Sequence, residues 1–425
     1  MEAIQDKGMA EQVEYTEHQE KQHVVTDFKH EKSPREKRLL LKQDLAIVPL
    51  LAGCFFFAYL DRTQIGNAKV MGMDADLNMS SSQYYNCLMM FFVGYMVFEL
   101  PAALTLRYIP APVVFGSSVV IFGVIACCIA ACHSYAPIMV LRLLTGAFEA
   151  VVQTGNLYLA QWYYPNEVGT RAEEEREMIF QRTKIARNVP DSRPKSVQIL
   201  LAIKDPKSWL QAMAVAAVCL NVAAFGVFLP TFISLFGFSP LMTQLYTMIP
   251  YAFGIVTLPI GNILADRFDK KGIPILVCLS VCLIGYILLL TSTSQTVLVV
   301  GCCFVSAGAY PAVVLSSAWV LISHAGFTKR ATSWAMAQIF IQCYSIISTQ
   351  VYVDPPRFFE GHGTLLGLNA LGVVAVLATM WIFDGENKRR DAVAAEFAAR
   401  GEVNPDSLKD YEELCDQHPD FRYTL

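Results

Sequence analysis

The chain has 425 residues and a net charge of −4, and its charged residues make up only 16% of the sequence against 54% hydrophobic residues. Soluble domains carry roughly 25% charged residues. The charges are also unevenly spread, because residues 209–265 and 272–328 carry none. Helices of soluble proteins keep a polar face, so two such stretches exclude a water-soluble fold. No basic stripe with interleaved aromatic residues is present, and nucleic-acid binding therefore has no support.

Ten apolar segments are long enough to cross a membrane as helices. A hydrocarbon core of about 30 Å needs about 20 helical residues. Windows of this length fall at residues 44–64, 84–106, 112–131, 136–160, 209–232, 243–265, 273–292, 297–323, 332–352 and 363–383. These runs are continuously apolar rather than alternating, which argues against membrane strands. The sequence predicts an all-α, polytopic membrane helical bundle with four spans before and six spans after a polar stretch.

Polar segments divide the chain into five regions. We expect a tail, a four-span N-terminal bundle, a charged linker, a six-span C-terminal bundle and a second tail, at residues 1–43, 44–160, 161–208, 209–383 and 384–425. Residues 391–400 can add two or three amphipathic helical turns before Gly401 ends them. Basic residues of the short connections collect on one side, where the rule of positive cytoplasmic loops applies. Both termini are therefore expected to be cytoplasmic.

Few ionisable side chains lie within the spans. Such a charge costs at least about 2.5–3.5 kcal/mol at mid-bilayer and usually marks a pathway. Arg142 and Glu149 are seven residues apart, on one face of the fourth span. In one interpretation Arg62 and Arg142 bind a substrate carboxylate, and Glu149 and Glu99 carry the coupling proton. The alternative is structural, with Arg142 and Glu149 as one ion pair and Asp61 with Arg62 as another.

Uncharged polar and aromatic residues of the spans leave further alternatives open. Each polar candidate could contact substrate or join two helices by a hydrogen bond. The candidates are Gln153, Asn156, Asn221, Tyr310 and Gln338. The neighbouring Phe91 and Phe92 are interpreted as lipid-facing. Neither the cysteines nor the histidines show metal-ligand spacing, so we expect no metal, no cofactor and no enzymatic chemistry.

The predicted span at residues 243–265 ends in a recognisable turn. Residues 261–272 read GNILADRFDKKG, which resembles the signature turn of the major facilitator superfamily. In such a gating turn Gly261 lets helices approach, Asp266 caps a neighbouring helix, and Arg267 with the following lysines holds the turn at the cytoplasmic surface. A chance turn with basic anchors is the alternative.

Four further strings are similar to one branch of that superfamily. Residues 60–68, 98–101, 142–150 and 162–171 read LDRTQIGNA, FELP, RLLTGAFEA and WYYPNEVGTR. They resemble the anion:cation symporter family, in particular its fungal allantoate-permease members. The resemblance implies a monomeric plasma-membrane transporter whose partners are a small organic anion, a proton and membrane lipid. It also implies alternating access, with the charges of the first and fourth spans as the functional ones. An efflux transporter for a small metabolite is an alternative.

The chain departs from the family pattern at one junction. Family members have twelve spans, and the string at 163–171 looks like their loop after the fourth span. It is followed directly by AEEERE at 172–177, which looks like their central loop after the sixth. We infer that spans 5 and 6 are missing, which leaves later spans correctly oriented but leaves bare the helices that would contact span 5. Such a chain could be a truncated form that does not transport, a regulatory form, or the product of a skipped exon.

Overall fold

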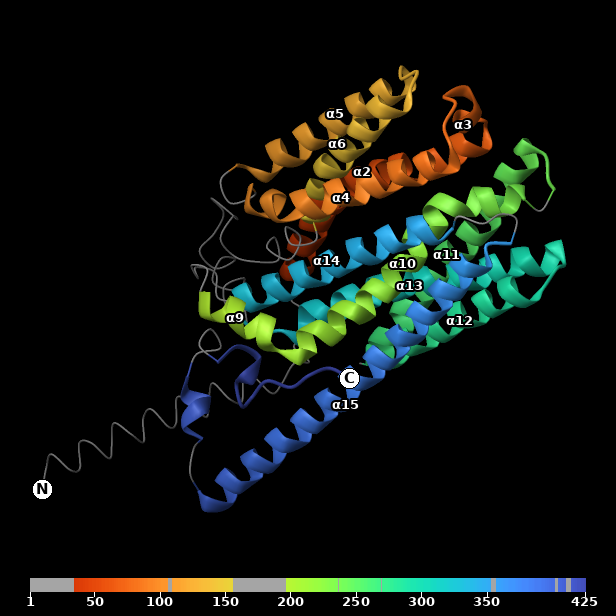
Figure 1. Ribbon diagram of the computed structural model, residues 1–425. Coiled ribbons are helices and arrows are strands. Elements are labelled where there is room, and N and C mark those ends of the chain that lie inside the picture. Colours follow the sequence, from red (N-terminus) through yellow and green to blue (C-terminus); the bar gives the residue numbers. More distant parts are fainter. Residues whose placement is uncertain are drawn as a thin grey trace, which may run out of the picture.

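The structure is a computed structural model that describes residues 34–105, 109–155, 196–235, 237–268, 270–352, 357–401, 404–409 and 414–425 (Figure 1). These residues form helices and connections, without a strand among them. The long helices are α2 (Pro34–Val70), α4 (Ser81–Thr105), α5 (Ala111–Ala130), α6 (Tyr135–Gln153), α10 (Pro206–Ser234), α11 (Pro240–Phe268), α12 (Gly272–Thr291), α13 (Gln295–Ser323), α14 (Phe327–Val351) and α15 (Phe359–Arg400). Short helices are α3 (Met73–Asp76), α9 (Ser196–Lys204), η2 (Pro405–Leu408) and η3 (Cys415–Gln417).

Each predicted span overlaps one of the ten long helices of the described residues, which confirms the all-α membrane bundle. Seven of these helices are long and apolar enough to cross a membrane by length and composition. The last helix differs from its predicted span, because α15 continues without a break from residue 383 to Arg400. The amphipathic turns expected at residues 391–400 therefore extend a helix of 42 residues, about 63 Å long. It projects well past the other helices in Figure 1.

The helices form two halves, with α2 to α6 in the N-terminal half and α9 to α15 in the C-terminal half. Glycine permits close packing in the first half: a Cβ on Gly146 would lie 2.0 Å from the Phe91 carbonyl oxygen, and one on Gly94 would lie 2.1 Å from that of Leu143. The backbones of α4 and α6 therefore touch, as small residues allow in membrane helices. Residues 156–195 lie outside the described residues, so the predicted region boundaries remain predictions.

The two halves meet at one end of the bundle. We call the end with α9 and the start of α10 the linker end, and the opposite end, with α3, the far end. A large core near the far end joins residues of both halves, among them Ile65 and Tyr85 from the first and Phe228 and Tyr352 from the second. The cores nearer the linker end draw their described members from one half each. The far end is therefore sealed by contacts between the halves.

Helix α11 is the least enclosed of the spans in the C-terminal half. Only 17% of its apolar window is buried, against 78% for that of α10. Its exposed side chains include Phe253, Val256, Ile260 and Ile263. Helix α11 packs mainly against α13, so a broad apolar face of it has no helix of this chain against it among the described residues.

Candidate functional site

Four charged side chains of α2 and α6 meet near the middle of the N-terminal half. Arg62 Nη2 lies 3.4 Å from Glu149 Oε2, and Arg142 Nη1 lies 3.7 Å from Asp61 Oδ2. Asp61 and Arg62 are neighbours on α2, whereas Arg142 and Glu149 lie two turns apart on one face of α6. The structure therefore pairs the four charges across the two helices, not within each helix as the structural alternative supposed.

These charges are shielded but incompletely satisfied. The side chain of Glu149 is fully buried, that of Arg142 is 5% exposed, and those of Asp61 and Arg62 are 15% and 25% exposed. Buried atoms without a hydrogen-bond partner include Arg62 Nε, Arg142 Nε, Asp61 Oδ2 and Glu149 Oε1. An unsatisfied buried donor costs about 1–3 kcal/mol. The two guanidinium groups thus keep donors that an anionic ligand could use.

Aromatic side chains of α4 cover the arginines. The guanidinium carbon of Arg62 lies 5.0 Å from the Phe91 ring centre and 5.2 Å from that of Tyr95, within range of a cation–π interaction. Phe91 and Phe92 are buried, so their interpretation as lipid-facing residues was wrong. Tyr95 donates a hydrogen bond to Gln153 Oε1 at 3.3 Å, which joins this predicted residue to the site.

Glu99 lies one helical turn beyond Tyr95 on α4. It is half-buried, and its buried Oε2 atom has no hydrogen-bond partner. Its position continues the face formed by Phe91 and Tyr95, because these residues are spaced four apart. Glu99 is therefore next to the charged group without being paired in it.

Tyr310 of α13 reaches the site from the C-terminal half. Its hydroxyl lies 2.8 Å from that of Tyr59, one turn before the charged pair on α2. A cavity of about 350 Å³ lies beside Tyr59 between α2, α10 and α11. Its polar lining includes Thr63, Asn67 and Gln244. Its lining also includes Leu241, Leu245 and Met248 of α11, which are exposed.

The other predicted residues lie elsewhere. Asn221 is fully buried in the C-terminal half, where its side chain bonds to Asn369 at 2.7 Å and to the Tyr286 hydroxyl at 2.8 Å. Gln338 is buried on α14, and its Nε2 atom has no hydrogen-bond partner. Asn156 lies outside the described residues. Roles of all three in substrate binding stay predictions.

The predicted gating turn, residues 261–272, begins in the last turns of α11, which ends at Phe268. A Cβ on Gly261 would lie 2.7 Å from Pro311 Cβ, so the glycine lets α11 approach α13. Arg267 is exposed in the last turn of the helix. The side chain of Asp266 lies outside the described residues.

Sequence reasoning missed part of the site. Tyr59 was not among the predicted residues. Asp61 was considered only as an ion-pair partner of Arg62, and Phe91 was interpreted as lipid-facing. One signal could have found the aromatic pair: Phe91, Tyr95 and Glu99 repeat every four residues, which places them on one helical face with a membrane carboxylate.

Comparison with known proteins agrees with this fold. A profile of the Major Facilitator Superfamily matches residues 51–172 and 170–349. The chain is 25% identical to the high-affinity nicotinic acid transporter of Saccharomyces cerevisiae over 92% of its own length and 85% of the relative's. It is 27% identical to an uncharacterized transporter of Schizosaccharomyces pombe, over 92% and 90% of the two lengths.

Solved structures share the arrangement of helices at low identity. A bacterial homolog of the human lysosomal transporter Spinster, in an inward-facing and unoccupied conformation, matches with a TM-score of 0.54 and 12% identity over 80% of this chain and 97% of that one. The nucleoside transporter NupG matches with a TM-score of 0.53 and 13% identity over 81% and 100%. Sequence profile and fold together place this membrane transporter chain in the major facilitator superfamily.

Proposed function

We propose that the chain moves a small organic anion across the membrane together with a proton, by alternating access to the site between α2, α4 and α6. The observation that carries this proposal is the crossed pairing of Arg62 with Glu149 and of Arg142 with Asp61, with buried guanidinium donors left over. A purely structural ion-pair network would be expected to satisfy its buried atoms. In this network, a carboxylate ligand would accept charge-assisted hydrogen bonds from the guanidinium donors that have no partner.

Coupling follows from competition for the same cation. When a substrate carboxylate binds Arg62, it displaces Glu149, whose carboxylate is then buried without a positive partner. Burial of an unpaired carboxylate favours its protonated form. Substrate binding and proton uptake at Glu149 would therefore occur together, and Glu99 is the second carboxyl on the proton's route.

The aromatic side chains favour a substrate with a flat ring. Phe91 and Tyr95 line one side of the arginines, and Tyr59 and Tyr310 lie one turn away. Aromatic rings pack well in offset or edge-to-face arrangements. The relative from Saccharomyces cerevisiae is a nicotinic acid transporter, and nicotinic acid is such a ring with one carboxyl group. We infer a small aromatic monocarboxylate as the substrate class.

The described conformation fits one step of that cycle. The halves are joined at the far end and have separate cores at the linker end. If the linker is cytoplasmic, as the basic loops indicate, the site opens inward. We propose the plasma membrane as its location, cytoplasmic termini, and a monomer as the working unit.

The test uses purified protein in liposomes, with radiolabelled nicotinate and benzoate as probes. An inward proton gradient should drive accumulation by the unmodified chain. Glu149→Gln should lose accumulation but keep exchange of internal for external probe, because exchange does not need proton release. The matched control is Glu396→Gln, whose carboxylate is exposed in α15. Equal gradient-driven accumulation by both variants would refute proton coupling at Glu149.

A second candidate is that this form binds substrate without transporting it, because two spans are missing. Three observations favour the missing spans: α11 is bare, the family match divides at residues 170–172, and the alignment with the nicotinic acid transporter runs over 459 positions, more than the 425 residues of this chain. Sequencing the transcript across codons 165–175 tests this directly. An inserted segment encoding two apolar spans would identify the shorter chain as a splice form or gene-model error.

A further inference from the structure

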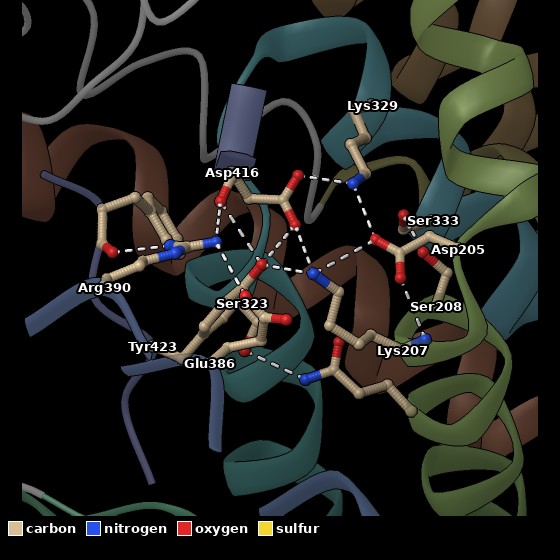
Figure 2. Close-up of polar contacts among 12 residues, drawn as sticks. Asp205, Lys207, Ser208, Ser323, Lys329, Ser333, Glu386, Arg390, Asp416 and Tyr423 are labelled. Atoms are coloured by element: carbon tan, nitrogen blue, oxygen red, sulfur yellow. Dashed lines mark hydrogen bonds and ion pairs between the residues drawn. The ribbon is translucent and has the colours of Figure 1, made fainter. Parts of the chain in front are cut away.

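The tail segment, residues 414–425, folds back onto the linker end of the C-terminal half (Figure 2). Asp416 is fully buried there and pairs with both Lys329 and Lys207. Its distance to Lys207 Nζ is 3.2 Å. The same carboxylate accepts a hydrogen bond of 2.7 Å from the Tyr423 hydroxyl within the tail. Asp416 is thus the buried anchor of the segment.

Side chains of four helices receive this segment, and we call the surface that they form the tail socket. It consists of Lys207 of α10, Trp319 of α13, Lys329 of α14, and Phe383, Asn387 and Arg390 of α15. All of these residues lie at the ends of helices α10, α13 and α14 or where α15 leaves the bundle. The tail therefore ties together helix ends that are otherwise separate in sequence.

Docking of the tail adds a carboxylate to a socket in which basic side chains outnumber acidic ones. Without the tail, Lys207, Lys329 and Arg390 face two carboxylates, those of Asp205 and Glu386. Asp416 supplies the third. Burial alone would raise the pKa of its carboxyl, but the neighbouring lysines lower that pKa well below its ordinary value, so the group stays ionised. A buried cation left without a partner is strongly unfavourable.

The socket also recognises the backbone of the tail. Arg390 donates to the carbonyl oxygens of Phe421 and Asp416, at 2.6 and 2.7 Å. Asn387 clamps Tyr423 with two bonds of 2.9 Å, one to its carbonyl oxygen and one from its amide. Trp319 Nε1 donates to the Thr424 carbonyl oxygen at 2.8 Å. Backbone contacts of this kind are how proteins bind extended peptides.

Apolar burial in the tail is limited to a few side chains. The Tyr423 ring stacks on Phe383 with centres 4.3 Å apart, and Phe421 is buried beside it. The helices that carry the socket are joined independently by the cores of the bundle. Release of the tail would therefore be a local opening that leaves the bundle folded.

We propose that the tail socket is a peptide-binding site, that its ligand is an acidic, aromatic segment, and that the chain's own residues 414–425 fill it reversibly. The buried charge of the aspartate decides whether the segment stays bound. Occupancy ties the ends of α10, α13, α14 and α15 to one another, and release removes these ties while the cores of the bundle keep the helices packed. An attached ligand has a high effective concentration, so the docked form dominates unless the anchor is lost.

Hydrogen exchange of the full chain, followed by mass spectrometry, is the first test. In the unmodified protein the amides of residues 414–425 should exchange far more slowly than those of residues 404–409, where Asp406 and Lys409 are exposed. Asp416→Asn should speed exchange in the tail about a hundredfold, given the cost of breaking a buried ion pair. Asp420→Asn is the matched control, since Asp420 is 49% exposed, and should change nothing. Asn387→Ala leaves no buried charge and should give about a tenfold increase.

Peptide binding is the second test. A fluorescein-labelled peptide of residues 414–425 should bind the full-length Asp416→Asn protein, whose own tail occupies the socket about a hundredfold less tightly, and should not bind the unmodified protein. The same peptide with asparagine at position 416 should bind neither. The proposal is overturned if the tail of the unmodified protein exchanges as fast as residues 404–409, or if the tail stays protected in both Asp416→Asn and Asn387→Ala. It is also overturned if the Asp416→Asn protein does not bind the peptide.

Discussion

The contact between Gly66 and Val227 makes the seal at the far end sensitive to one methyl group. Gly66 lies in α2 and Val227 in α10, so this contact joins the two halves. A Cβ added at Gly66 would lie 2.0 Å from the Val227 carbonyl oxygen and 3.0 Å from its carbonyl carbon. Ordinary contacts of Cβ atoms begin at 3.4 Å. Because the obstructing atoms belong to the backbone, no side-chain rotation relieves the clash, and the helices must separate.

We expect Gly66→Ala to destabilise the conformation closed at the far end relative to one that is open there. Overpacking of a well-packed contact costs about 1–3 kcal/mol. This cost falls on the closed form alone, since α2 and α10 part when the far end opens. The equilibrium constant between the two conformations should therefore shift roughly 5- to 150-fold toward the far-open form.

Cys87 reports the change. It is fully buried in α4, one turn from Tyr84, whose hydroxyl donates to the Ile65 carbonyl oxygen beside Gly66. Labelling by a membrane-impermeant maleimide, quantified by mass spectrometry at Cys87, should rise in Gly66→Ala. Gly53→Ala is the control, because a Cβ at Gly53 of the same helix meets nothing within 4 Å. Equal labelling of the two variants would refute the assigned role of the contact.

Three further predictions concern buried polar groups. Burial lowers the pKa of His324 to about 4, so below pH 6.5 only the unfolded chain takes up this proton and stability falls by up to about 3 kcal/mol toward pH 4; His324→Phe should flatten that pH dependence of the melting temperature. Asn221→Ala, which removes the bonds to Asn369, should cost about 1–3 kcal/mol and leave the KM for uptake unchanged. Arg142→Gln leaves Asp61 unpaired and should weaken probe binding, measured by equilibrium dialysis, about tenfold or more. An unaltered pH profile, a raised KM or unchanged binding, respectively, would contradict them.

The approximate positions of the spans could be read from the sequence because one physical rule governs them. A membrane span must satisfy its own backbone and bury about 20 apolar residues, so its signal is local. The end of α15 is an informative exception. The sequence stops the span near residue 383 on polarity, whereas the helix runs to Arg400. Polarity marks where the lipid ends, and α15 continues beyond that point, through Gly385, until its C-cap at Gly401.

The pairing of charges could not be read from the sequence in the same way. Spacing within α6 places Arg142 and Glu149 on one face, which suggested that they pair with each other. Their partners come instead from α2, because the packing of α2 against α6 brings Asp61 and Arg62 opposite them. Which helix lies opposite is a tertiary property, and no local pattern encodes it.

The tail shows the same limit more strongly. Residues 414–425 read as a polar extension, and nothing in their composition distinguishes Asp416 from Asp420. The structure makes one a fully buried ion and leaves the other 49% exposed. The difference lies in Lys207 and Lys329, more than eighty residues away along the chain.

The location of the charged site also bears on what the absence of two spans would do. The four charges and their aromatic cover come from α2, α4 and α6, and backbone contacts at Gly94 and Gly146 fix α4 against α6. None of these contacts involves α11, the helix left bare. Loss of spans 5 and 6 should therefore spare anion binding and act, if anywhere, on the movement of the halves. A chain that binds a labelled aromatic carboxylate but does not exchange it would fit this division, whereas loss of both would show that the missing spans shape the site itself.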